Sequence, residues 1–219
     1  MNFSNRPVWL LPAIAAAVSL VAVFAILAAR DMGGSQAGAA RSGPVRVSGE
    51  ADIGGPFTLV NHHGETVTEA DFRGRPMLIY FGFTYCPDIC PMSLQVMGAA
   101  LDQLPDDMAE RVQPVLISVD PERDTPEQLA RYVDSEAFPD NLVGLTGTPA
   151  QVRNAADAYR VYYARIESEG MSDYLMDHSS VIYLMDGEGK FVEVFPHGTA
   201  PDALADRLQH FLEETAARS

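Results

Sequence analysis

The sequence predicts an α/β domain, with a mixed β-sheet flanked by helices, that follows one N-terminal transmembrane helix. Three observations support this fold class. Beyond residue 49, apolar runs of strand length alternate with segments of helical periodicity. Two cysteines directly follow the first long apolar run, and a stretch of 22 uncharged residues lies near the amino terminus.

The uncharged stretch covers residues 8–29, with only Pro12 and Ser19 as interruptions. At 1.5 Å per residue it forms about 33 Å of helix, which is enough to cross the hydrocarbon core of a membrane. Small residues at 37–39 also fit a signal-peptidase site, so a cleaved leader stays open as the alternative. The length of the apolar span favours an uncleaved anchor.

This pattern divides the chain into three parts. We expect a membrane anchor at 1–30, a flexible linker of small, polar and Gly-rich residues at 31–48, and a folded domain at 49–219. The basic residues on the two sides of the span are nearly balanced, so the positive-inside rule does not fix the orientation of the anchor.

The composition excludes some classes of protein. The 219 residues carry 15 basic and 30 acidic side chains, a net charge of −15, and residues 1–30 hold none of the acidic ones. A domain this acidic has no broad basic surface for phosphates, so we expect no nucleic acid partner. Two cysteines are too few for a disulfide framework, and so close a pair is expected to do chemistry.

The expected elements follow one another along the folded domain. Residues 57–67 contain two short strand-like segments around a turn and indicate a hairpin. The apolar run 76–83 indicates a central strand buried on both faces. Apolar residues at helical spacing from Leu94 to Leu104 then indicate a helix, and residues 115–119 indicate a second buried strand.

The second half of the domain continues the alternation. Thr125 is a capping residue before Pro126, and Gln128 is placed to return the capping hydrogen bond, so a helix starts here. The segment Asp120–Thr125 is expected to pin the connection from strand to helix. The remaining expected elements are a helix at 149–159, a strand at 161–166, a hairpin around 186–187 and an amphipathic helix at 201–216.

The cysteine pair, Cys86 and Cys90, lies in the segment Thr84–Pro91 directly after the central strand, which makes the predicted domain thioredoxin-like. Because proline is tolerated in the first turn of a helix, we expect the next helix to begin near Pro91, with both sulfurs on the loop that enters it. The helix dipole favours thiolates there, and thiolates suit either a redox nucleophile or a ligand of Cu(I) or Zn(II).

Five histidines are available as a third ligand for such a metal site. His62 and His63 lie in the expected turn, and His210 lies among polar residues of the last helix, so we expect these three to be exposed to solvent. His197 follows the end of a strand and stays a weaker candidate.

His178 is the strongest candidate among them. It precedes the strand at 181–184, at the place where a thioredoxin-like fold brings a cis-proline beside the cysteine loop, and no proline occurs there. From this place a histidine can reach both sulfurs and complete a site of two sulfurs and one nitrogen. Asp177, its neighbour, is expected to orient or tune the ligands from outside the ligand set.

These residues together resemble the Sco/SenC family of copper-binding assembly factors for cytochrome c oxidase. The resemblance extends over roughly residues 55–215. The segments that carry it are Gly55–Leu59, Tyr80–Thr84, Cys86–Pro91, Ser118–Pro126, Gly144–Thr148 and Asp177–Ser179.

The resemblance implies a thioredoxin-like protein that binds one copper ion, as Cu(I) or Cu(II), through Cys86, Cys90 and His178. It implies a non-enzymatic copper chaperone and thiol reductant that helps assemble the binuclear copper centre in subunit II of cytochrome c oxidase. It also implies a single-pass protein of the inner (cytoplasmic) membrane, with the soluble domain in the periplasm. A periplasmic copper donor or thiol reductant is a further implied partner.

Two other functions stay open at this point. A metal-independent thiol–disulfide oxidoreductase uses Cys86 and Cys90 as a redox-active pair and has no need for His178. A thiol peroxidase needs Thr or Ser three residues before its reactive cysteine, where this chain has Phe83, although Thr84 is close.

Overall fold

The computed structural model describes residues 52–167 and 174–217, which all belong to one compact unit, Gly43–Ser219. The expected anchor at 1–30 and the expected linker at 31–48 lie outside the described residues. Within the described ranges, no helix combines the length and the apolar composition that a membrane span needs.

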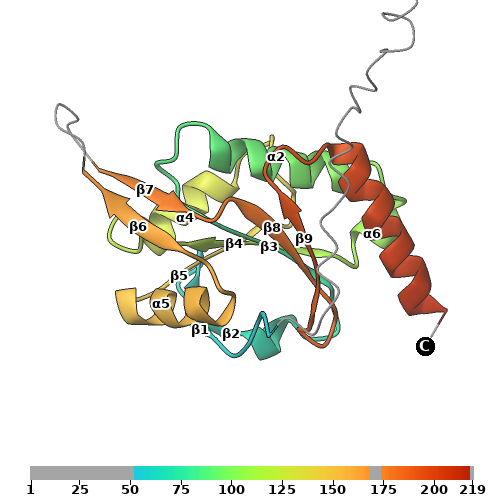
Figure 1. Ribbon diagram of the computed structural model, residues 1–219, viewed down its shortest axis with the longest axis horizontal. Helices are drawn as coiled ribbons and strands as arrows, with labels where there is room; N and C mark the ends of the chain where they lie inside the picture. Colours follow the sequence, from blue (N-terminus) through green and yellow to red (C-terminus); the bar gives the residue numbers. More distant parts are fainter. Residues whose placement is uncertain (1–51, 168–173, 218–219) are drawn as a thin grey trace, which may run out of the picture. The chain divides into compact units, whose positions relative to one another are not determined.

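The domain is built on one seven-stranded mixed sheet (Figure 1). Its strands are β1 (Thr58–Asn61), β2 (Thr66–Thr68), β3 (Met77–Gly82), β4 (Gln113–Ser118), β5 (Val143–Thr146), β8 (Val181–Met185) and β9 (Phe191–Pro196). They run in the order β2-β1-β5-β4-β3-β8-β9. The three central strands β5, β4 and β3 are parallel, and the strands on either side of them pair antiparallel.

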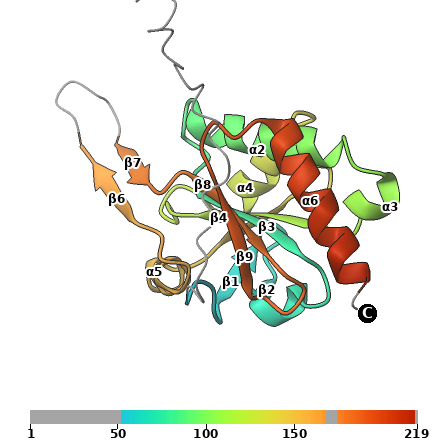
Figure 2. The same ribbon diagram turned by 45° about the vertical axis from the view of Figure 1, so that its right-hand side comes forward.

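Helices cover both faces of this sheet. They are α2 (Ile89–Leu101), α4 (Pro126–Val133), α5 (Pro149–Ala158) and α6 (Pro201–Ala216), with two short elements, η1 (Glu69–Phe72) and α3 (Asp106–Ala109). The helices α2, α4 and α6 lie on one face, and α5 lies on the other (Figures 1 and 2). A mixed sheet flanked by helices, with the cysteine pair between β3 and α2, confirms the predicted thioredoxin-like arrangement.

The central strand β3 separates the two faces of the sheet. All of its residues are buried, as the apolar run predicts. Because successive strand residues point to opposite faces, Tyr80 points toward α2 and Phe81 points toward α5. The Tyr80 hydroxyl lies 3.8 Å from the sulfur of Cys90, and the Phe81 ring lies 5.5 Å from the ring of Tyr159 at the end of α5. The first turn of α2 therefore packs directly on the central strand.

Gly82 ends β3 on the same face as Tyr80. A Cβ atom at this position would lie 3.0 Å from the Cys90 sulfur and 2.7 Å from a ring carbon of Tyr80. Real Cβ atoms are almost never that close to a neighbour, so the strand approaches the cysteine this closely because it ends in glycine.

Two further strands form a hairpin apart from the main sheet. β6 (Tyr163–Ile166) pairs antiparallel with β7 (Leu175–His178) and extends to one side of the domain (Figure 1). The sequence predicts the strand at 161–166 but not β7, because the four residues of β7 show no alternation of polar and apolar side chains. His178 is thus the last residue of β7, and two serines separate it from β8.

Helix boundaries differ from the prediction at the cysteine loop. α2 begins at Ile89 rather than near Pro91, so Cys90 lies inside the first turn and only Cys86 lies on the loop. Proline fits here because the first N–H groups of a helix have no partner within it, and Pro91 occupies one of those positions.

The predicted reciprocal cap of α4 is also wrong. Thr125 caps the helix by accepting a hydrogen bond from the Gln128 backbone, but the Gln128 side chain donates to Thr84 instead of returning the bond. The reciprocal capping box forms at α5, between Thr148 and Gln151. The sequence does not predict β5, η1 or α3, each of which spans only four residues, too few for periodicity to show.

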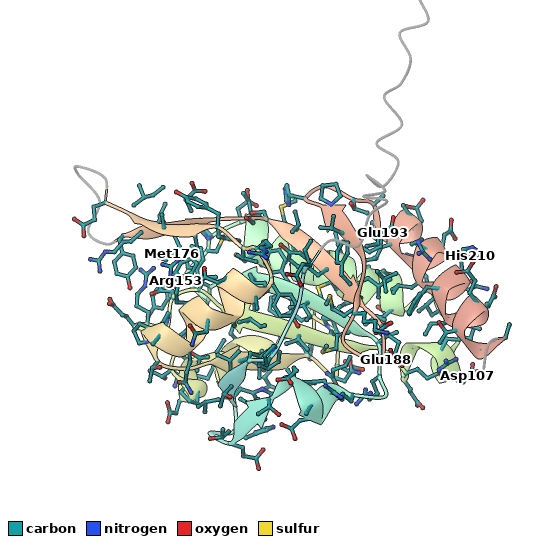
Figure 3. All side chains as sticks on the ribbon, turned by 60° about the horizontal axis from the view of Figure 1, so that its bottom comes forward. Asp107, Arg153, Met176, Glu188, Glu193 and His210 are labelled. Atoms are coloured by element: carbon teal, nitrogen blue, oxygen red, sulfur yellow. The ribbon has the colours of Figure 1, made fainter. Side chains whose placement is uncertain are left out.

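An ion pair joins the last helix to the last strand. The guanidinium of Arg207 on α6 donates to the carboxylate of Glu193 on β9 (Glu193 is labelled in Figure 3). The Glu193 side chain is 5% exposed. Breaking a buried ion pair by removing one partner costs more than the pair itself contributes, because a charge is left buried without compensation.

We expect Arg207→Ala to lower the free energy of unfolding by about 3 kcal/mol, because it leaves the Glu193 carboxylate buried and unpaired. Urea unfolding of the full chain, followed by circular dichroism, measures this loss. Lys190→Ala, which breaks an exposed ion pair with Glu188, is the matched control and should cost under about 1 kcal/mol. Equal losses in the two variants would contradict the structural role of the Glu193–Arg207 pair.

Candidate metal centre

The two cysteines lie on either side of the start of α2. The backbone N–H of Cys86 donates to the carbonyl of Phe83 at 3.3 Å, which turns the chain sharply after β3. The backbone N–H of Cys90, in the first turn of the helix, donates to the sulfur of Cys86 at 3.4 Å. Both thiols are free, Cys90 is fully buried and Cys86 is partly exposed. The Cys86 sulfur therefore lies at the amino end of α2 with an N–H group directed at it.

His178 meets this pair from a separate segment. Its Nε2 lies 3.4 Å from the Cys90 sulfur, and its Nδ1 lies 3.3 Å from the carbonyl oxygen of Ser179. The rings of Tyr80 and Phe83 contact the imidazole edge-on, each with a centroid distance of 5.9 Å. A ring proton on Nδ1, donated to this carbonyl, would leave the Nε2 lone pair free for a metal ion.

The two thiols have opposite electrostatic character. A hydrogen bond from the Cys90 thiol, with further donors at His178 and in the helix backbone, holds the pKa of Cys86 far below its ordinary value. The same hydrogen bond and the burial of Cys90 raise the pKa of Cys90. The two shifts have opposite directions, and they favour the thiolate at Cys86 and the thiol at Cys90.

The cysteine loop is tied down by a buried carboxylate. Asp124, which is fully buried, accepts hydrogen bonds from both the backbone N–H and the hydroxyl of Thr84, the latter at 2.6 Å. It also accepts a 2.6 Å hydrogen bond from the hydroxyl of Ser118, at the end of β4. Burial nevertheless raises the pKa of Asp124 above its ordinary value. Asp124 therefore joins the connection after β4 to the residue two positions before Cys86.

A second branch of this network reaches the strand that carries His178. Asp120 accepts hydrogen bonds from the Arg123 guanidinium and, at 2.7 Å, from the hydroxyl of Tyr174. Arg123 also donates to the Tyr174 carbonyl at 3.0 Å and lies 3.6 Å from the centre of its ring. On its other side Arg123 lies over the ring of Tyr85, at 4.7 Å. One arginine thus holds both the cysteine loop and the start of β7.

These contacts extend the role predicted for the segment Asp120–Thr125. The sequence assigns it to the connection between strand and helix, and the structure adds contacts to Thr84, Tyr85 and Tyr174. The run of polar side chains Asp-Pro-Glu-Arg-Asp-Thr indicates in the sequence that this segment forms hydrogen bonds. The sequence does not indicate which distant residues are the partners. Tyr80, which contacts both Cys90 and His178, is also missing from the predicted site, because it reads as an ordinary residue of a buried strand.

Asp177 lies next to His178 in β7 and is exposed to solvent. Because neighbouring residues of a strand point to opposite faces, its side chain points away from the face on which His178 meets Cys90. Its predicted influence on the ligands stays a prediction. Thr84, the residue that kept a thiol peroxidase open, directs its hydroxyl to Asp124.

Three other histidines, His62, His63 and His210, lie away from the two sulfurs. His62 is half-buried rather than exposed, since its Nδ1 accepts the backbone N–H of Gly144 at 3.1 Å, and burial lowers its pKa. His63 is exposed, as expected. His210 is exposed and pairs with Glu214, and Figure 3 shows it on α6 at the opposite end of the view from the β6–β7 hairpin.

Cys86, Cys90 and His178 are thus brought together from two segments of the chain. In the described part of the chain, no group of three or more His, Cys, Asp or Glu side chains is arranged to hold a metal ion as it stands. The donor set, two sulfurs and an imidazole, nevertheless fits a soft monovalent or borderline divalent ion. A metal would require the cysteine loop or His178 to shift so that all three donors converge.

The fold and the site define a thioredoxin-like protein with a cysteine pair and a histidine in place of the usual cis-proline; the described residues contain no cis peptide bond. The chain belongs to the SCO1/SenC family, whose model matches residues 45–213. Protein SenC of Rhodobacter capsulatus is 40% identical over 216 residues, which is 97% of this chain and 93% of that protein.

A mitochondrial relative from Arabidopsis thaliana, SCO1 homolog 1, is 46% identical over 168 residues, or 77% of this chain. This chain spans only 49% of the length of that relative. The match is therefore to the folded domain of a longer mitochondrial protein.

Two solved structures extend the comparison. The structure of Bradyrhizobium japonicum ScoI with copper bound has a TM-score of 0.65 and 42% identity, and covers 73% of this chain and 99% of that one. BsSco, described as a member of the Sco family of cytochrome c oxidase assembly proteins with a disulfide switch, has a TM-score of 0.57 and 26% identity, and covers 74% and 92%.

The asymmetry of the thiols gives a test of the site geometry. In the reduced full chain, we expect iodoacetamide to modify Cys86 well below the pH at which a free cysteine reacts. Cys90→Ala should raise the midpoint of this pH profile by about one unit or more, since it removes the main donor to the Cys86 sulfur. Mass spectrometry of the alkylated peptide measures the profile. His210→Ala should leave the midpoint unchanged, and an unchanged midpoint in Cys90→Ala would contradict the hydrogen-bonded pair.

Proposed function

We propose that this chain binds one copper ion through Cys86, Cys90 and His178. We further propose that it helps assemble the binuclear copper centre of cytochrome c oxidase subunit II. The observation that carries the proposal is the approach of His178 Nε2 to within 3.4 Å of the Cys90 sulfur, beside the Cys86 sulfur. Membership of the SCO1/SenC family and a copper-bound structure of a relative support it.

The donors suit copper in its reduced form. Sulfur ligands favour Cu(I), and imidazole is a common additional ligand. Cys86 is already a thiolate, whereas Cys90 must give up its proton when it becomes a ligand, so copper binding releases a proton to solvent. The contact of His178 Nδ1 with the Ser179 carbonyl holds the imidazole in the tautomer that binds through Nε2.

The same arrangement suits copper as a cargo that is later passed on. Two donors lie on one loop and helix start, and the third lies on a separate strand, so a movement of either segment opens the site. Oxidation of Cys86 and Cys90 to a disulfide removes both sulfur ligands, and loading therefore depends on a reductant.

The proposal includes the place where this exchange occurs. Residues 8–29 would anchor the chain in the inner membrane as a single span, with the folded domain in the periplasm. There a periplasmic copper donor or thiol reductant would supply the domain, and subunit II would receive copper from it. The net charge of −15 favours partners with a basic docking surface.

A metal-independent thiol–disulfide oxidoreductase is the second candidate. The observation in its favour is the pairing of a partly exposed thiolate, Cys86, with a buried thiol, Cys90. This is the division between an attacking and a resolving cysteine that dithiol exchange requires. Dithiol exchange needs no histidine at this place, so this function does not explain why His178 lies beside Cys90.

Removal of any one ligand distinguishes the two candidates. We expect Cys86→Ala, Cys90→Ala and His178→Ala each to weaken Cu(I) binding by about 100-fold or more, since each removes a direct ligand. A competition titration of the reduced full chain against a chromophoric Cu(I) chelator measures the affinity. His62→Ala, which changes a half-buried histidine elsewhere, is the matched control and should bind as the wild type does.

Asp177→Ala, measured in the same titration, tests the predicted influence of that carboxylate on the ligands, and we expect a smaller loss of Cu(I) affinity than for the ligands themselves.

Full retention of Cu(I) affinity in His178→Ala, together with reversible oxidation of the cysteine pair, would favour the oxidoreductase instead.

A further inference from the structure

A small apolar pocket lies beside the cysteine–histidine site, between α2 and the ends of β8 and β9. Its volume is about 40 Å³, enough for a single ion or water molecule. Met92 and His197 both line this pocket, one from α2 and one from the turn after β9. Neither side chain has a part in the proposed Cys86–Cys90–His178 site.

Both side chains are set in place by their elements. Met92 lies on α2 with Ser93 and Val96, which also line the pocket, and its side chain is 45% exposed. The backbone N–H of His197 donates to the carbonyl of Ser180 at 3.1 Å, which fixes the turn against the start of β8.

The pocket adjoins the sulfur site through one side chain. The Tyr80 hydroxyl lies 3.8 Å from the Cys90 sulfur and also interacts with Ser93 and Ser180, both of which line the pocket. The hydroxyl of Tyr80 therefore contacts both Cys90 and residues that line the pocket. An ion held in the pocket would thus lie next to the Cys86–Cys90–His178 site.

The chemistry of the pocket selects the ion. Its polar donors of metal-binding type are one thioether and one imidazole, with no carboxylate among its lining residues. Hard cations need oxygen ligands, whereas thioether sulfur and imidazole nitrogen together suit Cu(I), which accepts low coordination numbers.

We propose that Met92 and His197 form a second, weaker Cu(I) site that holds the ion next to the Cys86–Cys90–His178 site during loading or release. The proposal rests on the proposed function of that site. In loading, the bonds from Cu(I) to the Met92 sulfur and the His197 nitrogen break, and bonds to both cysteine sulfurs and to His178 form. Cys90 gives its proton to solvent, and copper stays Cu(I) throughout, so no electron is transferred.

Silver ion is the probe for this second site, because Ag(I) takes soft ligands as Cu(I) does and is not oxidised to a divalent ion. The full chain, reduced and in detergent, carries ¹³C-labelled methionine methyl groups and is titrated with Ag(I) under NMR observation. We expect the first equivalent to leave the Met92 methyl signal nearly unmoved and the second equivalent to shift it. His197→Gln should weaken the second binding event by about tenfold or more, and Met92→Leu should abolish it.

Two controls match these variants in residue type. Met108→Leu and His210→Gln change a methionine and a histidine remote from the pocket and should leave both binding events unchanged. A second event that persists unaltered in His197→Gln, or a Met92 signal that never moves, would overturn the proposal while leaving the first event intact. If the wild-type protein shows no first binding event, the Cys86–Cys90–His178 site is overturned instead. In that case a shift of the Met92 signal that depends on His197 would still support the site in the pocket.

Discussion

The carboxylate of Asp124 is the point on which the geometry of the site depends. It is fully buried and accepts hydrogen bonds from the backbone N–H of Thr84 at 3.1 Å and from the hydroxyls of Thr84 and Ser118 at 2.6 Å each. Burial raises its pKa, and these hydrogen bonds act in the opposite direction. The bonds join the residue two positions before Cys86 to the end of β4.

The segment that these bonds hold is the sharp turn from β3 into α2. With Thr84 held by Asp124, the Cys86 sulfur lies at the amino end of the helix, and Cys90 lies against Tyr80 and the bare backbone of Gly82. Arg123, through Tyr174, extends the same network to β7 and so to His178. Asp124 and this network thus place three donors from two segments within reach of each other, while Cys86 on the loop stays partly exposed.

Much of this could be predicted from the sequence. Apolar runs predict β3 and β4, Thr125 and Pro126 predict the start of α4, and the position of the cysteine pair directly after the first buried strand predicts the thioredoxin-like arrangement. The sequence also predicts Cys86, Cys90 and His178 as ligands, and the structure places them close together, while their role as ligands stays a prediction.

The rest depends on contacts that leave no local pattern. β7 has no period to detect, because its partner β6 and the network at Tyr174 determine it rather than its own residues. The role of Gln128 follows from Thr84, a residue 44 positions away, and not from the capping rule at its own helix. Tyr80 gains its role only because Cys90 and His178 come to meet it.

X-ray absorption at the copper edge of the full chain, loaded with one equivalent of Cu(I), tests the central claim most directly. We expect a first coordination shell of two sulfurs and one imidazole nitrogen, with the imidazole signature lost in His178→Ala. A shell with a single sulfur, or one unchanged by His178→Ala, would contradict the account of a site assembled from the cysteine loop and β7.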